Sequence, residues 1–329
     1  MKSRIAAGVA FLLLFISPSY AVDLEQSNVK VFIKMMVKEH DYDRDELLGI
    51  LGEAELKNSI IEQISKPAEK TFTWAEYRPI FMTKERIRAG ADFWRENRTA
   101  LEDVSARSGV PVEILVGIIG VETYFGRITG GHRVLDALAT LAFNYPPRSK
   151  FFRAELEQFL LLVREENMRA TDAFGSYAGA MGRPQFMPSS YRAFAIDANG
   201  DGKRDIWNNW TDVAGSIANY FNAHGWTSGE EVASRASIGS RWTGPIPKNK
   251  LKPEETVASL SAKGVMFTTA LPADSEGQLL TLEGADGFEH WVGFHNFFVI
   301  TRYNHSVMYA LAVHQLGQEI ALEVQASAQ

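Results

Sequence analysis

The most restrictive feature of this sequence is that none of its 329 residues is a cysteine. The chain therefore has no disulfide framework, no cysteine-ligated zinc or iron–sulfur site, no thiol nucleophile and no lipid-bearing N-terminal cysteine. A hydrophobic core must hold it together, and hydrophobic residues make up 46% of the sequence against 22% charged residues. A chain of this length buries roughly three quarters of its surface on folding, and a prior of one domain per ~150 residues predicts about two domains.

The first residues have the pattern of a secretory signal peptide. Lys2 and Arg4 precede an apolar run of 12 residues, Ile5–Ile16, and small residues follow up to Ala21. The run is well below the ~20 residues that span a bilayer. We expect residues 1–21 to be removed; an uncleaved membrane anchor is the alternative. Removal takes away two cations and no acid, so the net charge moves from −6 to −8. A protein this acidic is a poor nucleic-acid binder, and we expect it outside the cytoplasmic membrane.

Hydrophobic periodicity separates helical from β-rich parts of the chain. Apolar residues at three-to-four spacing predict helices over 29–37, 45–51, 58–64 and 83–106. Pro111 and Gly126 bound a further helix, and Thr211 or Asp212 is expected to cap one that stops at Gly225. After Gly229, short runs separated by turn residues predict strands at 235–243, 256–260, 265–269, 278–282, 289–294 and 297–303. Helix returns from Ser306 to about Glu323.

These patterns predict an α+β fold that is mainly α. We expect a helical packing domain over 22–108, a core of helices and glycine-rich loops over 109–229, a small β-rich inserted domain over 230–295, and a return to the core over 296–329.

Glu122 is the first candidate for chemistry because of where a helix places it. Its neighbours three, four and seven residues back on the same face are Ile119, Ile118 and Leu115. Desolvation in an apolar setting raises the pKa of a carboxyl group, and a protonated acid can protonate a glycosidic oxygen. In the alternative, structural interpretation, Glu122 reaches water or pairs with Arg127.

The segment that begins at Asp197 has the spacing of an EF-hand-like calcium loop. Oxygen donors suited to a hard cation occur at alternate positions, with a glycine at position 6. The predicted ligands are Asp197, Asn199, Asp201, the carbonyl of Lys203, and Asp205. Position 12 is Asn208 rather than the usual glutamate, and Asp212 could supply the missing carboxylate from a longer loop. We expect a weakly held structural ion; a solvated turn is the alternative.

A glycine-rich loop over 175–190 mixes Ser and Gln with Tyr, Phe and Met. Glycine allows close backbone approach, and this mixture of side chains suits sugars, which offer both hydroxyl groups and apolar faces. Tyr303, Asn304 and Tyr309 repeat the same chemistry late in the chain. A tightly packed structural loop is the alternative.

Several motifs follow one another in a fixed order. They are Gly-Val-Glu-Thr at 120–123, the runs 179–182 and 185–189, the calcium-like loop, and the segments 219–221, 224–226 and 303–304. In this order they closely resemble the lytic murein transglycosylase B family, over most of the chain after the leader. The resemblance implies a lysozyme-like core with a helical domain and a small β domain. It also implies cleavage of peptidoglycan between N-acetylmuramic acid and N-acetylglucosamine without water, which leaves a 1,6-anhydro sugar.

The same resemblance assigns roles to residues. Glu122 would act first as acid and then as base. The saccharide groove would be lined by Ser176, Gln185, Tyr220, Tyr303, Asn304 and Tyr309. Arg148 would meet the peptide stem, although Pro147 stands where family members often carry a second arginine.

The resemblance further implies peptidoglycan glycan strands as the partner. We expect no organic cofactor, and the loop at 197–205 predicts a structural Ca²⁺ ion. We expect a periplasmic monomer without a stable membrane anchor and without nucleic acid. Two rival interpretations stay open: a hydrolytic muramidase of the same fold, and a non-catalytic peptidoglycan-binding scaffold protein. The chemical ends of the products would distinguish the first rival, and the intact Glu122 motif speaks against the second.

Overall fold

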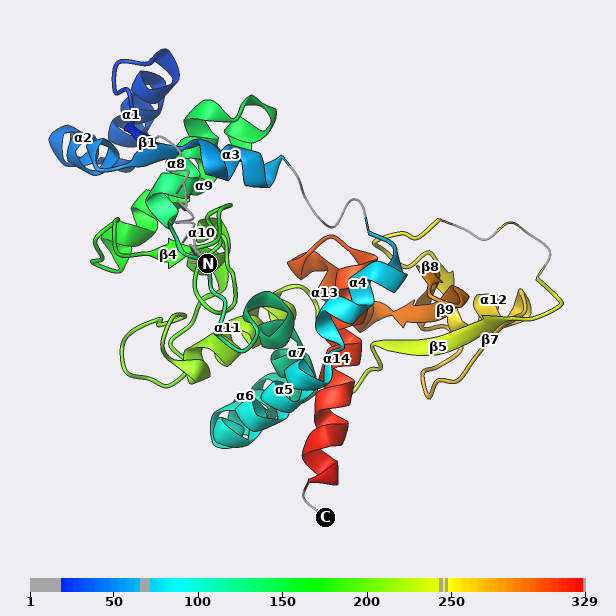
Figure 1. Ribbon diagram of the computed structural model, residues 1–329. Helices are drawn as coiled ribbons and strands as arrows, with labels where there is room; N and C mark the ends of the chain where they lie inside the picture. Colours follow the sequence, from blue (N-terminus) through cyan, green and yellow to red (C-terminus); the bar gives the residue numbers. More distant parts are fainter. Residues whose placement is uncertain (1–18, 66–71, 243–244, 246–247, 328–329) are drawn as a thin grey trace, which may run out of the picture.

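The computed structural model of the chain describes residues 19–65, 72–242, 245 and 248–327 (Figure 1). The described residues are mainly helical, with one five-stranded sheet and two two-stranded pairs, so the predicted fold class is confirmed. The predicted leader lies outside the described residues except for 19–21. The domain boundaries predicted at 108, 229 and 295 remain predictions.

A first group of N-terminal elements packs on α8 (Val134–Asn144) and α9 (Ser149–Glu165) (Figure 1). The group comprises β1 (Ser19–Ala21), α1 (Ser27–His40), α2 (Arg44–Gly52), β2 (Glu55–Lys57) and α3 (Asn58–Ile64), and β1 pairs antiparallel with β2. Asp136, a fully buried acid on α8, accepts the N–H of Glu55 at 3.0 Å and pairs with Lys57 Nζ at 2.8 Å. Because a buried charge is tolerated only when it is paired, this contact fixes β2 on α8.

A second group packs on α7 (Val112–Thr123) and α14 (Val307–Ala326). It consists of α4 (Trp74–Phe81), α5 (Lys84–Glu96) and α6 (Arg98–Ser108). The prediction of one helix over 83–106 was therefore wrong. The chain breaks at Asn97, whose side chain donates to the Phe93 carbonyl oxygen at 2.9 Å and competes with the helical hydrogen bonds.

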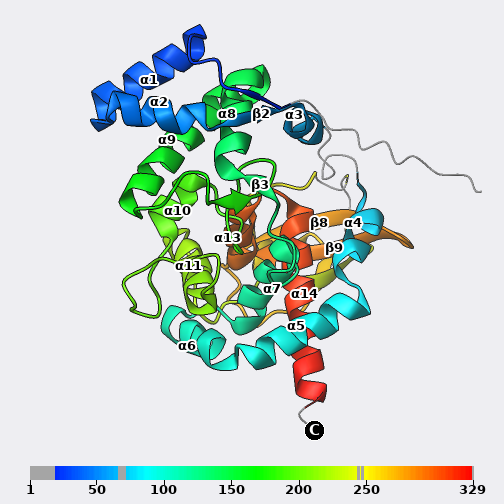
Figure 2. The ribbon, with the colours of Figure 1, turned by 60° about the vertical axis from the view of Figure 1, so that its left-hand side comes forward.

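Helices α7 and α14 cross in the middle of the molecule at two glycines (Figures 1 and 2). A Cβ atom on Gly117 would lie 2.5 Å from the carbonyl oxygen of Val313. A Cβ atom on Gly317 would lie 2.2 Å from the carbonyl oxygen of Glu113. Both distances are too short for any side chain, so the two backbones approach closely only because glycine stands at both positions.

The core around α7 is completed by short elements and α11 (Trp210–Ala223). These are β3 (His132–Arg133), η2 (Pro146–Arg148), β4 (Phe174–Gly175) and α10 (Pro188–Phe194). The predicted cap of α11 was wrong: Asn209 is the N-cap, and its side-chain oxygen accepts the N–H of Thr211 at 2.9 Å. Asparagine is among the preferred residues at this position.

The sheet lies to one side of α14 (Figure 1). Its strands pair antiparallel in the order β6-β8-β9-β5-β7. They are β5 (Ala233–Ile238), β6 (Glu255–Thr256), β7 (Val265–Phe267), β8 (Glu276–Gly284) and β9 (Gly287–Phe294). The sheet has a small core of its own, formed by Leu260, Val265, Leu279, Val292 and Phe294.

Two runs predicted as strands are helices. The run 256–260 falls in α12 (Val257–Ala262), because Thr256 caps that helix by accepting the N–H of Ser259 at 3.2 Å. The run 297–303 falls in α13 (His295–Tyr303), which is buried against β9 and α14. Its aromatic and β-branched residues favour a strand locally, and tertiary packing overrides that preference.

No single helix in the described part of the chain is both long and apolar enough to cross a membrane. Helices α6 and α7 satisfy that test only when taken together, and they are bent by 118° at their junction.

Gly117→Ala should reduce the free energy of unfolding by about 1–3 kcal/mol, the usual cost of forcing an extra carbon into a packed core. The control is Gly49→Ala, since Gly49 lies within α2 and a Cβ there would meet nothing within 4 Å. Alanine's helix propensity should make that variant more stable by about 0.5–1 kcal/mol. Urea unfolding measures both, and equal effects would contradict the role given to the α7–α14 contact.

Candidate active site

Glu122 occupies the last turn of α7 and is partly buried. The hydroxyl of Tyr309 donates a hydrogen bond to Glu122 Oε1 at 2.5 Å. Tyr309 lies in the first turn of α14, where the Ser306 side chain accepts its N–H at 3.2 Å. The contact thus joins the C-terminal end of one central helix to the N-terminal end of the other.

Two tyrosines keep their protons beside Glu122. Burial, with the Glu122 carboxylate as the next cause, raises the pKa of Tyr309 well above its ordinary value of 10. The pKa of Tyr303 is raised by the same two causes in the same order. Tyr303 donates its hydroxyl hydrogen to the Pro184 carbonyl oxygen at 2.6 Å. Both phenols are therefore donors at neutral pH, and Tyr309 donates to the carboxyl group itself.

Thr123 is a part of the site that the sequence interpretation missed. Its side chain is fully buried, lies 3.2 Å from the Arg183 carbonyl oxygen and accepts the N–H of Gly126 at 3.1 Å. It therefore ties the end of α7 to the glycine-rich loop. The motif at 120–123 contained the signal, because a threonine at a helix end commonly bonds to nearby backbone groups.

The polar side chains of the glycine-rich loop help to shape that loop. Gln185 has a left-handed φ of 54°, and its Nε2 donates to the carbonyl oxygens of Thr129 at 3.1 Å and Gly182 at 2.8 Å. Ser176 Oγ accepts the N–H groups of Ala178 and Ala180. These contacts use the amide nitrogen of Gln185 and the acceptor capacity of Ser176. Further bonding by either residue therefore uses the Gln185 carbonyl oxygen or the Ser176 hydroxyl hydrogen.

Tyr220, on α11, packs against Tyr303. The residue is 8% exposed, and the centre of its ring lies 4.9 Å from the centre of the Tyr303 ring. Its hydroxyl donates to the Arg302 carbonyl oxygen at 2.6 Å, and burial raises its pKa to about 12. The contact with Tyr220 thus helps to hold the Tyr303 ring in place.

The remaining residues predicted to contact substrate are Arg148, in η2, and Asn304, at the end of α13. Arg148 ends η2 and is exposed, with its guanidinium 4.4 Å from the Phe151 ring centre and 5.1 Å from that of Phe152. Asn304 follows α13 as its C-cap, and its carbonyl oxygen accepts the N–H of Ser306 at 2.7 Å. Asn304 therefore lies in the short connection that leads into α14.

The loop from Asp197 to Asp205 is folded around its first carboxylate. Asp197 Oδ1 accepts the N–H of Gly200 at 2.7 Å and of Asp201 at 3.1 Å, and Oδ2 accepts that of Gly202 at 2.7 Å. Gly200 and Gly202 have φ values of 79° and 87°, which the loop needs for this turn.

Asp212 is turned toward the backbone of the same loop. It is fully buried, its Oδ1 accepts the N–H groups of Ala198 and Asn199, and its Oδ2 accepts that of Asp205 at 2.9 Å. Across the described residues, no three Asp, Glu, His or Cys side chains are grouped closely enough to hold a metal ion. The donor set is rich in oxygen, as a hard cation requires, and the side chains are arranged around backbone amides.

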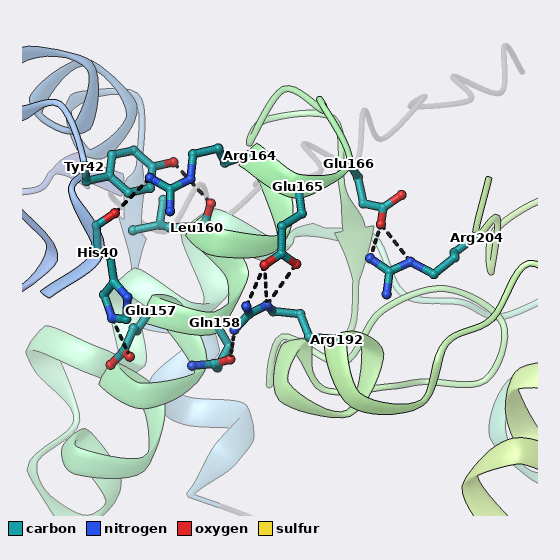
Figure 3. A network of polar contacts seen from close by, with 10 residues as sticks. All are labelled: His40, Tyr42, Glu157, Gln158, Leu160, Arg164, Glu165, Glu166, Arg192 and Arg204. Carbon is teal, nitrogen blue, oxygen red and sulfur yellow. Dashed lines mark hydrogen bonds and ion pairs between the residues drawn. The ribbon is translucent and has the colours of Figure 1, made fainter. Parts of the chain in front are cut away.

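One ion pair, between Arg204 and Glu166, ties the loop to the rest of the core (Figure 3). Arg204 Nε donates to Glu166 Oε1 at 2.8 Å, and the Tyr191 hydroxyl donates to the Arg204 carbonyl oxygen at 2.6 Å. Next to this pair, Arg192 on α10 binds Glu165 on α9. The loop therefore shares its support with α9 and α10.

The site places one carboxyl group at the end of the central helix, bound by a buried phenol, and such a group can serve as an acid or a base. The family comparison identifies the fold as lysozyme-like and the protein as an enzyme. The chain belongs to the transglycosylase SLT domain family, whose model matches residues 25–318. It is 42% identical, over 90% of this chain and 83% of the relative, to the membrane-bound lytic murein transglycosylase B of Escherichia coli K12.

Solved structures of lytic transglycosylases are also similar to this chain. A structure of catenated lytic transglycosylase SltB1 from Pseudomonas aeruginosa has 46% identity and a TM-score of 0.86, covering 91% of this chain and 98% of that one. A structure of the E. coli lytic transglycosylase Slt35 in complex with calcium has 42% identity and a TM-score of 0.84, covering 93% and 96%. The family resemblance predicted from the motifs is confirmed.

Tyr309→Phe should lower kcat about 10- to 100-fold, because a hydrogen bond to a charged group is worth about 1.5–3 kcal/mol. KM should stay within about threefold if the bond acts mainly on the carboxyl group during the reaction. Tyr42→Phe is a matched control: its buried hydroxyl donates to the Leu160 carbonyl oxygen at 3.1 Å, and that bond lies on α9. Steady-state turnover of peptidoglycan measures both, and equal kcat values for the two variants would contradict this role.

Proposed function

We propose that this enzyme cleaves peptidoglycan between N-acetylmuramic acid and N-acetylglucosamine and closes the muramic acid product into a 1,6-anhydro ring. The observation that carries the proposal is the bond from Tyr309 to Glu122 at the end of α7. Glu122 is the only carboxylate among the charges that raise the pKa of Tyr303 and Tyr309 in the described part of the chain. Ordinary glycosidases use two carboxyl groups, whereas a single one suffices when the sugar supplies its own nucleophile.

In the first step, Glu122 as an acid gives its proton to the glycosidic oxygen, and the bond from muramic acid C1 to that oxygen breaks. N-acetylglucosamine leaves with a new hydroxyl group. Tyr309 stabilises the carboxylate that forms, because a hydrogen bond from a neutral donor is stronger to a charged oxygen. Its raised pKa keeps the phenol protonated for this task.

In the second step, the C6 hydroxyl oxygen of the same muramic acid attacks C1. Glu122 as a base takes the hydroxyl proton, which restores the acid form for the next cycle. No atom of water enters the product. The attacking group is already part of the sugar, so the protein needs only to hold the ring in position.

We further propose that substrate contacts come from the residues around this acid. Tyr303 lies close enough to Glu122 for the carboxylate to raise its pKa, and the loop that holds Gln185 and Ser176 is tied to Thr123 through the Arg183 carbonyl oxygen. The supporting residues would be Tyr220 and Asn304. Arg148 would meet the peptide stem, and its stacking on Phe151 and Phe152 leaves an exposed guanidinium for that role.

We also propose a structural calcium ion in the loop, and a periplasmic monomer after removal of the leader. Asp197, Asn199, Asp201 and the Lys203 carbonyl would hold the ion, whose part would be to stiffen the loop. The support for the ion is the loop's donor chemistry, together with the calcium complex of the Slt35 relative. Asp205 and Asp212 would contribute from outside by fixing the loop backbone, as their present hydrogen bonds do.

Glu122→Gln should keep the fold and glycan binding and lower turnover by at least ~10³-fold, since an amide neither gives nor takes the proton. Glu113→Gln on the same helix is the control and should stay near wild type. Mass spectrometry of digested sacculi should show ends lighter by one water than reducing ends. Reducing ends would identify a hydrolytic muramidase, and binding without turnover by the wild type would identify a scaffold protein.

Chelation with EGTA should lower the melting temperature by about 4–5 °C, the shift expected for a ligand worth about 3 kcal/mol in a protein of this size. Calcium should restore it and magnesium should not. Asp201→Ala should remove the response to both treatments. An unchanged melting temperature after exhaustive chelation would contradict the calcium proposal.

A further inference from the structure

The chain turns sharply after Glu122 through three left-handed residues. Tyr124, Phe125 and Gly126 have φ values of 50°, 58° and 79°. Tyrosine and phenylalanine rarely adopt this conformation, and two in succession must be held by their surroundings. The turn begins two residues after Glu122, so whatever holds it also fixes the end of the helix that carries the carboxyl group.

Arg86 contacts this turn from α5. Its Nη1 donates to the Gly120 carbonyl oxygen at 2.9 Å, and the same oxygen accepts the N–H of Tyr124 at 3.2 Å. The Arg86 guanidinium also lies over the Tyr124 ring, 4.5 Å from its centre. One side chain therefore binds both ends of the hydrogen bond that closes the final turn of α7.

The surroundings of Arg86 keep it in this position. Thr83 caps α5 and accepts the N–H of Arg86 at 3.1 Å, which fixes the backbone from which the side chain extends. The ring of Phe81 lies 5.2 Å from the guanidinium. Arg127 lies 5.0 Å from the Tyr124 ring, so the phenol contacts two cations. Burial lowers the pKa of Arg86, and the group remains charged because guanidinium is not deprotonated in proteins.

The packing of Phe125 also fixes the position of the turn. Its ring fills the space over Gly120, where a Cβ atom would lie 2.8 Å from Phe125 Cε1. The ring also stacks on Phe93 of α5 with centres 5.5 Å apart. Helix α5 therefore contacts the turn at two points, through Arg86 and through Phe93. Among the α5 side chains with described hydrogen bonds, only Arg86 donates to α7.

We propose that Arg86 is a positioning residue for the reaction, which holds the last turn of α7 so that the Glu122 carboxyl group keeps its orientation toward the scissile bond. This inference rests on the proposed function of Glu122. Displacing a catalytic group by about 1 Å can cost 10²-fold in rate without a change in its chemistry. Arg86 acts through Gly120 and Tyr124, and it does not itself touch the reacting atoms.

The test compares Arg86→Ala and Arg86→Lys with Arg88→Ala, an exposed arginine on the same helix. Arg86→Ala should lower kcat about 100-fold, the cost of a misplaced catalytic group, with KM within about threefold. Lysine keeps the charge without the planar stack, so Arg86→Lys should fall between wild type and alanine. Guanidinium ion added at millimolar concentration should raise kcat of Arg86→Ala and leave Arg88→Ala unchanged.

These measurements distinguish a positioning role of Arg86 from a purely structural one. A fall in kcat that guanidinium partly restores, at a melting temperature well above the assay temperature, supports positioning. Wild-type kcat in Arg86→Ala overturns the inference. A loss of activity that follows the unfolded fraction, without rescue by lysine or guanidinium, also overturns it in favour of a purely structural role. If wild type itself releases no anhydro ends, the proposed function fails instead, whatever the arginine variants do.

Discussion

The close contact of α7 with α14 is the constraint on which the rest of the structure depends. At Gly117 and Gly317 each backbone meets the other with no room for a side chain. This distance sets the phenol of Tyr309 against Glu122, although the two residues lie 187 positions apart in the chain. The flanking helices and the glycine-rich loop then serve to hold the two helix ends still, through Arg86, Thr123 and Tyr303.

The three buried acids in the described part of the chain differ from Glu122, which is only partly buried. Asp136 binds Lys57, Arg133 and a backbone amide. Asp212 binds three backbone amides, and Glu155 binds the backbone and side chain of Ser189. Each of these carboxylates has a fixed partner set that stabilises its charge and connects two segments. Glu122 accepts a hydrogen bond from a neutral phenol, which stabilises the carboxylate without cancelling its charge. That difference suits a group that must alternate between acid and base.

The sequence predicts those features of the fold and the site that depend on residues close together in the chain. Pro111 and the apolar face fixed the central helix, which starts at Val112, and its last turn singled out Glu122. Contacts between distant segments carried no such signal: nothing near Arg86 indicates that it reaches Gly120. The break at Asn97 was missed because a side chain, rather than a glycine or proline, ends the helix. The strand prediction for 297–303 failed because burial against α14 outweighs local propensity.

The central claim is that one carboxyl group serves both steps and that the sugar, not water, supplies the second oxygen. Digestion of sacculi in water enriched in oxygen-18 tests it most directly. The account predicts that the muramic acid ends released by the wild-type enzyme contain no oxygen-18 at any stage of the digest. Incorporation of one labelled oxygen per cleaved bond would show that water attacks C1, and would contradict the account.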